Sequence, residues 1–117
     1  MRIGLDLDDT VYAYPDFFRE LIEAFHAKGH TFFCTSGHAR SEWSEDCKQL
    51  RMLGIDPDKI SPEMMYPERN IHIHLKGKQA DQLDYVFDDD ARIQKHTATP
   101  VFCSPNIMNR RYNYANE

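Results

Sequence analysis

The sequence lacks several features that would place it in common classes of protein. Its three cysteines, Cys34, Cys47 and Cys103, are odd in number and form no C-x-x-C pair, so a disulfide framework is not indicated. No apolar run approaches the length of a membrane span, and Met1 leads almost directly into an apolar strand without a secretory leader. We therefore expect a cytoplasmic protein with buried, reduced thiols and no membrane contact.

Positive charge is also scarce, because the chain has 14 Lys and Arg residues and 19 Asp and Glu residues. Nucleic-acid binding relies on an excess of Lys and Arg, so a broad nucleic-acid-binding face is disfavoured, and Arg110–Arg111 is too short to replace it. What is present is a globular composition, with 41% hydrophobic and 12% aromatic residues among 117. The length predicts a single domain over residues 1–117.

Apolar strands and amphipathic helices alternate along the chain. The pattern predicts strands at 2–6, 31–35, 71–75, 85–88 and 100–103, and helices at 15–28, 41–53, 78–84 and 91–96. Residues 56–68 hold three prolines and read as a loop, and the polar tail 109–117 reads as partly loose. This alternation predicts an α/β fold: a three-layer, Rossmann-like parallel sheet of about five strands.

Acidic residues follow two of these strands at the point where each strand ends. Asp6 and Asp8 follow the first strand, and Asp88 and Asp89 follow the fourth, whereas Asp90 is expected to cap the turn after it. Neighbouring parallel strands present their carboxyl ends at one edge of a sheet, so these acids are expected to share a site. Crowded carboxylates either hold protons or surround a cation, and Mg²⁺ suits oxygen ligands beside a phosphate.

Two further polar groups follow the second and third predicted strands. Thr35, with Ser36 and Gly37, offers a hydroxyl and backbone N–H groups that suit a phosphoryl oxygen, although an ordinary turn has the same composition. Lys76 and Lys78 each follow the third predicted strand, where a lysine could balance the acids or simply be solvated. We take Lys78 as the site lysine because it opens the predicted helix, with Lys76 as its rival.

The order of these groups resembles the motif order of the haloacid dehalogenase superfamily of phosphohydrolases over residues 2–103. The matching residues are, in order, Asp6-Leu7-Asp8-Asp9-Thr10, then Thr35 with Ser36-Gly37, then a lysine, then Asp88-Asp89. The acidic pair at the end and residues 100–106 are similar to small 5′-nucleotidases. No extra domain fits after the first or second motif, so the chain resembles a capless member, with no separate cap domain.

The resemblance implies a hydrolase, a Mg²⁺-dependent phosphomonoesterase that forms an aspartyl-phosphate, with a nucleotide as the first candidate substrate. It implies that Asp6 attacks phosphorus and that Asp8 protonates the leaving oxygen. Thr35 and Lys78 would hold the phosphoryl group, with Ser36, Gly37 and Lys76 beside the substrate. The implied Mg²⁺ ligands are Asp6, Asp8 through its backbone carbonyl, Asp88 and Asp89.

Alternatives of other classes remain open from the sequence. A non-catalytic metal- or phosphate-binding relative and a phosphotransferase would share all of these residues, whereas a phosphate-accepting receiver domain fits poorly. The expected partner is a small-molecule phosphate ester. A site without a cap is open, so water must be excluded by a large substrate that covers it, by a neighbouring subunit of a homo-oligomer, or by a flap at residues 11–14. His38, His72 and His74 could suggest zinc, but without a third ligand we interpret them as solvent-facing.

Overall fold

A computed structural model gives the fold of the chain and describes residues 1–103; the predictions for 104–117, including Arg110–Arg111, lie outside this range. The strands are β1 (Arg2–Leu5), β2 (Thr31–Cys34), β3 (Ile60–Ser61), β4 (Tyr85–Phe87) and β5 (Val101–Phe102). The helices are α1 (Pro15–Ala27), α2 (Trp43–Met52) and α3 (Ile73–Ala80). Shorter helical turns are η1 (Leu7–Val11), η2 (Arg40–Glu42), η3 (Pro57–Lys59) and η4 (Ala91–His96).

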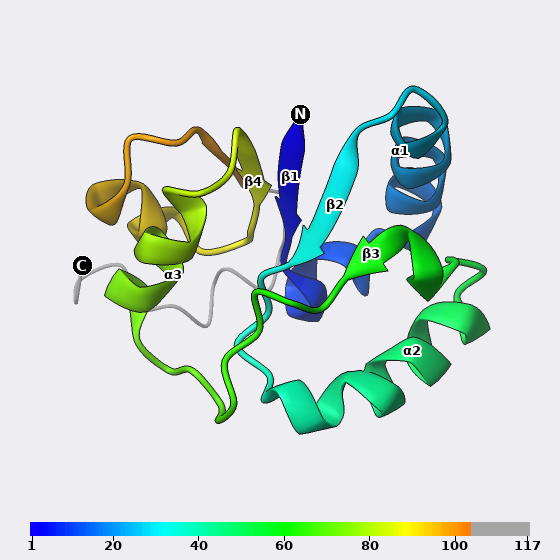
Figure 1. Cartoon of the computed structure of the whole chain (residues 1–117), viewed down its shortest axis with the longest axis horizontal. Helices are drawn as coiled ribbons and strands as arrows, with labels where there is room; N and C mark the ends of the chain where they lie inside the picture. Colours follow the sequence, from blue (N-terminus) through cyan, green and yellow to red (C-terminus); the bar gives the residue numbers. More distant parts are fainter. Residues whose placement is uncertain (104–117) are drawn as a thin grey trace.

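The five strands form one sheet in the order β3-β2-β1-β4-β5, and every neighbouring pair is parallel. This confirms the predicted α/β class with a Rossmann-like parallel sheet. Strand β1 lies in the centre between β2 and β4, so the segments that leave these three strands begin side by side (Figure 1). None of the helices among residues 1–103 has the length and apolar content that crossing a bilayer requires.

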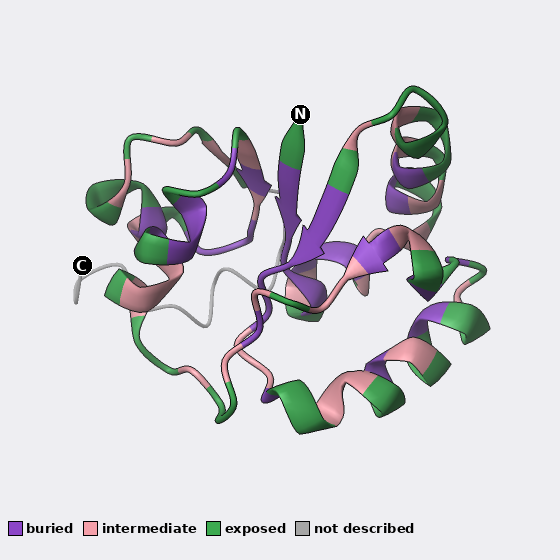
Figure 2. Ribbon diagram, in the orientation of Figure 1, coloured by how far each residue is buried: buried purple, intermediate pink, exposed green. Residues whose placement is uncertain are grey.

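Helices cover both faces of the sheet, as a three-layer arrangement requires. On one face α1 and α2 pack on Ile3, Leu5 and Phe32 through a core that includes Phe18 and Leu50. On the other face α3 and η4 lie over a smaller apolar cluster made of Phe33, Ala80, Leu83 and Val86. The sheet interior is buried and the outer helix faces are exposed (Figure 2). The strand ends are thus held by a packed core on each side.

The segment that contains His72 and His74 is wrongly predicted as a strand. It forms the start of α3, and the third strand is instead Ile60–Ser61, inside the proline-rich stretch that was predicted as loop. The alternation of apolar and polar residues over 71–75 is short, and Ile71 is 83% exposed rather than buried. The helix packs closely on η4 at Gly77, where an added Cβ would lie 2.5 Å from the Cβ of His96.

The expectation of buried thiols holds for one cysteine and fails for another. Cys34 is buried, Cys47 is half-buried and Cys103 is exposed, and all three are free. Burial raises the pKa of the Cys34 thiol to about 12. Cys103 is exposed because β5 is a two-residue edge strand that ends before it. Cys34 therefore acts as a small core residue, as its place on a central strand requires.

Candidate functional site

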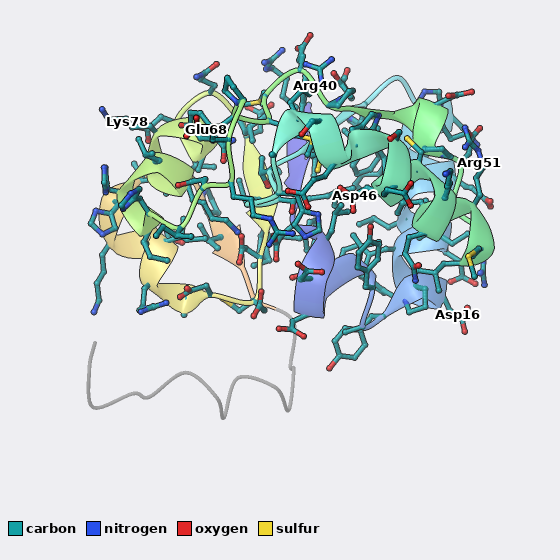
Figure 3. The ribbon with its side chains drawn as sticks, turned by 90° about the horizontal axis from the view of Figure 1, so that it is seen from below. Asp16, Arg40, Asp46, Arg51, Glu68 and Lys78 are labelled. Atoms are coloured by element: carbon teal, nitrogen blue, oxygen red, sulfur yellow. The ribbon has the colours of Figure 1, made fainter. Side chains whose placement is uncertain are left out.

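Three aspartates meet in a buried cluster at the carboxyl ends of β1 and β4. Asp6 follows β1, and its backbone N–H donates to the Phe87 carbonyl at 3.0 Å, which aligns it with the segment after β4. One carboxylate oxygen each of Asp6, Asp88 and Asp89 lies within 4.8 Å of the other two. All three residues are buried. The two acidic segments therefore converge for these residues, whereas the Asp8 carboxylate is outside the cluster. Figure 3 looks onto this edge of the sheet.

Lys76 supplies the positive charge of the cluster. Its Nζ donates to Asp88 Oδ2 at 2.7 Å and to Asp6 Oδ1 at 3.1 Å. Lys78, the lysine chosen from the sequence, is exposed at the periphery of the molecule and does not reach these acids (Figure 3). The choice is corrected because α3 begins five residues earlier than predicted, and this turns Lys76 toward the sheet edge and Lys78 away from it.

Burial is the largest influence on the pKa values of Asp6 and Asp88. Burial and the charge of Asp88 raise the pKa of Asp6 well above its usual value, although Lys76 opposes the shift. Burial likewise raises the pKa of Asp88, against the effect of Lys76. Burial disfavours the charged form of Lys76, but the charges of Asp6 and Asp88 outweigh it and raise its pKa. One ammonium thus faces three carboxylates, which leaves negative charge for a further cation.

The donor set fits a hard divalent cation. Three carboxylates within 4.8 Å of one another offer only oxygen ligands, as Mg²⁺ prefers. A cation among them would favour the charged carboxylates and so oppose the burial and repulsion that raise the pKa values of Asp6 and Asp88. Thr10 supports the arrangement, since its Oγ1 donates to Asp6 Oδ2 at 3.3 Å. The ligand role of the Asp8 carbonyl stays a prediction.

Asp8 lies at the mouth of the site on a kinked turn. Within η1, Asp8 has extended dihedral angles and Asp9 has a φ of 61°, in the left-handed region that aspartate tolerates better than most residues. The Asp8 side chain is 61% exposed, and His38 Nε2 lies 2.6 Å from its Oδ2. The hydrogen bond from His38 lowers the pKa of Asp8. His38 is therefore a site residue, although the sequence left it as solvent-facing.

His38 is held from behind by a second carboxylate. His38 Nδ1 lies 3.0 Å from both oxygens of Asp46, which is buried on α2 and close to the centre of the view in Figure 3. The Tyr12 hydroxyl donates to Asp46 Oδ1 at 2.8 Å. Hydrogen bonds to Asp46 and Asp8 raise the pKa of His38 to about 10. The turn predicted as a flap is thus held in place, because Val11 lies in the core and the Tyr12 hydroxyl donates a hydrogen bond to Asp46.

The loop after β2 forms the opposite wall. Ser36 and Gly37 line the same cavity as the acids, and Ser36 Oγ accepts the backbone N–H of His38 at 3.1 Å. Gly37 lies against the loop before α3, because an added Cβ would be 2.6 Å from the Asn70 carbonyl oxygen. Thr35 is buried beneath this wall rather than lining the cavity, and its Oγ1 has no hydrogen-bond partner among the described residues.

The resulting cavity has a volume of about 310 Å³. Besides the acids and Lys76, it is lined by Ser36 to His38, by the loop 69–72 with Ile73 at the start of α3, and by Arg92. Arg69 forms a two-bond ion pair with Glu42, and Arg92 a two-bond ion pair with Asp90. Asp90 also accepts the Arg92 backbone N–H at 3.0 Å, which confirms it as the cap of η4. The lining therefore combines five aspartates with the basic side chains of Lys76, His38, Arg69 and Arg92.

The other histidines divide between the rim and the outer surface. His72 lines the cavity and His74 does not, and their rings lie 5.5 Å apart. Within residues 1–103, the group of metal-ligating side chains consists of Asp6, Asp88 and Asp89. Asp46 and the Tyr12 hydroxyl were missed by the sequence reasoning. A signal for Asp46 existed, since it is an acid four residues before Leu50 on the inward face of a helix.

Comparison of the chain with protein-family models, with curated proteins and with solved structures finds no match in any of the three. The resemblance to haloacid dehalogenases therefore stays a prediction. Any function must be argued from the residues that this chain brings together.

Proposed function

We propose that the chain is a Mg²⁺-dependent phosphomonoesterase of the haloacid dehalogenase type, with Asp6 as the nucleophile. The observation that carries this proposal is the environment of Asp6, which Lys76 contacts at 3.1 Å beside two further buried carboxylates. A carboxylate can attack an anionic phosphate only where positive charge offsets the repulsion between them. Lys76 provides one such charge, and the acid cluster can hold another.

Asp6, Asp88 and Asp89 are the residues that would hold Mg²⁺. A bound Mg²⁺ would neutralise the charge on the phosphoryl oxygens. Lys76 binds a phosphoryl oxygen as a point cation while it fixes Asp6 and Asp88. This division of roles explains why a lysine with a raised pKa is buried among acids whose pKa values are also raised.

The proposed reaction has two steps. In the first, an Asp6 oxygen bonds to phosphorus, the bond from phosphorus to the ester oxygen breaks, and Asp8 donates a proton to that oxygen. In the second, a water oxygen bonds to phosphorus, the bond to Asp6 breaks, and Asp8 accepts a proton from the water. The products are the alcohol and phosphate, with Asp6 and Asp8 returned to their starting states.

The loop after β2 is assigned to phosphate positioning. Ser36 and Gly37 line the cavity and can offer polar groups to a phosphoryl oxygen. The unpartnered hydroxyl of Thr35 beneath them is a buried polar group of the kind that folded proteins rarely leave unsatisfied. Thr35 does not line the cavity, so Ser36 and Gly37 carry this part of the proposal.

The substrate class is a phosphate ester whose alcohol part reaches out of an open cavity. A nucleotide is the first candidate, and the rim formed by the loop 69–72 and Arg92 is where its remaining groups would lie. Closure of the site would come from the substrate itself or from a second subunit of a homo-oligomer.

Hydrolysis of 4-nitrophenyl phosphate by the purified chain with MgCl₂ tests the proposal. We expect Asp6→Asn to abolish turnover and the matched change Asp58→Asn to leave it intact, because Asp58 is exposed in η3 at the amino end of β3. An inactive wild type that Mg²⁺ nevertheless stabilises would favour the non-catalytic alternative. A phosphotransferase would give a phosphorylated product when an alcohol is added as acceptor.

A further inference from the structure

We propose that His38 is a positioning residue that holds the Asp8 carboxylate in place for proton transfer, and that Asp46 and Tyr12 hold His38 in turn. The proposal rests on the proposed phosphomonoesterase function and adds to it a second layer of residues. The four side chains come from three places in the fold: η1 and the residue after it, the loop after β2, and α2.

The imidazole of His38 lies between two carboxylates. Nε2 is 2.6 Å from Asp8 Oδ2, and Nδ1 is 3.0 Å from both oxygens of Asp46. A ring that donates from both nitrogens satisfies the Asp46 carboxylate, which only accepts hydrogen bonds. It also satisfies Oδ2 of Asp8, which accepts whether Asp8 is ionised or carries its proton on Oδ1. Each contact is a charge-assisted hydrogen bond, the strong and directional kind. The ring is therefore held in one orientation.

The far end of the network is anchored in the core. The Asp46 side chain is only 8% exposed, and an unpaired carboxylate there would be strongly unfavourable. The Tyr12 hydroxyl donates to Asp46 Oδ1 at 2.8 Å, while the Tyr12 backbone N–H donates to the Leu7 carbonyl at 3.0 Å. Because Tyr12 directly follows the turn that carries Asp8, the network closes on that same turn.

The need to satisfy the buried Asp46 does not by itself explain why His38 also contacts Asp8. Tyr12 and one nitrogen of His38 already satisfy Asp46, yet the other nitrogen reaches a side chain that is 61% exposed. An exposed aspartate samples several rotamers, whereas a general acid must stay within reach of the leaving oxygen. His38 binds Oδ2, and no hydrogen bond between described residues engages Asp8 Oδ1. Oδ1 is thus the oxygen available to the substrate.

Dependence on the leaving group distinguishes positioning from a structural role. Phenolate is a basic leaving group that needs a proton from Asp8, whereas 4-nitrophenolate departs with little help. The ratio kcat/KM reports the steps up to phosphorylation of Asp6, in which the leaving group departs. We therefore compare kcat/KM for phenyl phosphate and 4-nitrophenyl phosphate in saturating MgCl₂.

We expect His38→Gln to lower kcat/KM for phenyl phosphate by about 10- to 100-fold, the loss typical of a displaced catalytic group. The same variant should lower kcat/KM for 4-nitrophenyl phosphate by roughly 3-fold or less. Tyr12→Phe removes a single hydroxyl and should give the same pattern with smaller losses, which keeps the test valid if His38→Gln folds poorly. His26→Gln, at an exposed position near the end of α1, is the matched control.

Equal losses on both substrates, or no loss on either, in both variants would overturn the positioning role while leaving the phosphatase activity established. A wild type that hydrolyses neither ester would overturn the proposed function, and the positioning role with it. The two failures are thus distinguishable in one set of measurements.

Discussion

Replacing Lys76 by methionine tests the electrostatic design of the cluster directly. Methionine fills a similar volume but removes the ammonium that lies 2.7 Å from Asp88 and 3.1 Å from Asp6. Removing one partner of a buried ion pair typically costs about 3–5 kcal/mol, because the remaining charge is left without compensation. Two lost hydrogen bonds to charged groups, at roughly 1.5–3 kcal/mol each, give a similar figure. We expect the free energy of unfolding to fall by about this amount at pH 7.

Urea unfolding followed by far-UV circular dichroism, without Mg²⁺, measures the effect. The matched control is Lys78→Met, the same change two residues further along α3 at an exposed position. Its free energy of unfolding should stay within about 0.5 kcal/mol of the wild-type value. The corresponding fall in Tm for Lys76→Met is roughly 10–20 °C for a chain of this size. Equal urea midpoints for the two variants would refute the reasoning.

The loss in Lys76→Met should also depend on pH, with a defined sign. Burial already raises the pKa values of Asp6 and Asp88 in the folded state, and without Lys76 they rise further. A carboxyl whose folded pKa exceeds its unfolded pKa makes the fold less stable as pH rises through that folded value. The difference in free energy of unfolding between Lys76→Met and the wild type should therefore become smaller on acidification from pH 7 to 5. Adding Asp88→Asn should recover part of the loss, since it removes one uncompensated charge.

Three further predictions concern the metal, the loop wall and His38. Thermal melts should show that MgCl₂, at 100 times its Kd for the wild type, raises the free energy of unfolding of the wild type by about 2.7 kcal/mol. The same MgCl₂ concentration should stabilise Asp89→Asn much less. Gly37→Ala should lower the urea-derived stability by about 1–3 kcal/mol, since its Cβ would lie 2.6 Å from the Asn70 carbonyl oxygen; an unchanged midpoint contradicts this. Because the pKa of His38 is raised to about 10, its stabilising contribution is complete below pH 6.5 and lost as pH rises through 10. The stability gap between wild type and His38→Gln should therefore narrow from pH 7 to pH 10, and a constant gap would contradict it.

The parallel sheet and the convergence of its acids could be predicted from local pattern. Buried parallel strands read as short apolar runs, and β1, β2 and β4 are such runs within a residue of their predicted ends. Asp6, Asp88 and Asp89 then meet because strands of one direction end at one edge. These features depend on residues next to each other in the chain and on a topology rule, so they need no knowledge of side-chain packing.

The prediction was wrong where two periodicities compete over a few residues. Residues 71–75 alternate as a strand does, but residues 73–75 form the start of α3, which packs closely on His96 at Gly77. The change of element decides which lysine reaches the acids, since positions two apart on a helix point in different directions. Lys76 and Lys78 are equivalent by composition and differ only in the direction that packing gives them.

The chain of amino acids alone determined the α/β class and the aspartates that gather at one edge of the sheet, because strand patterns and topology rules are local and general. Only the tertiary structure decided that Lys76 joins them and that Asp46 and Tyr12 hold His38 against Asp8. The reason is geometric. The contacts of Lys76 with Asp6, Tyr12 with Asp46 and His38 with Asp8 join residues 30 or more positions apart. They depend on how α2 and α3 rotate as they pack on the sheet, and no nearby residue encodes that rotation.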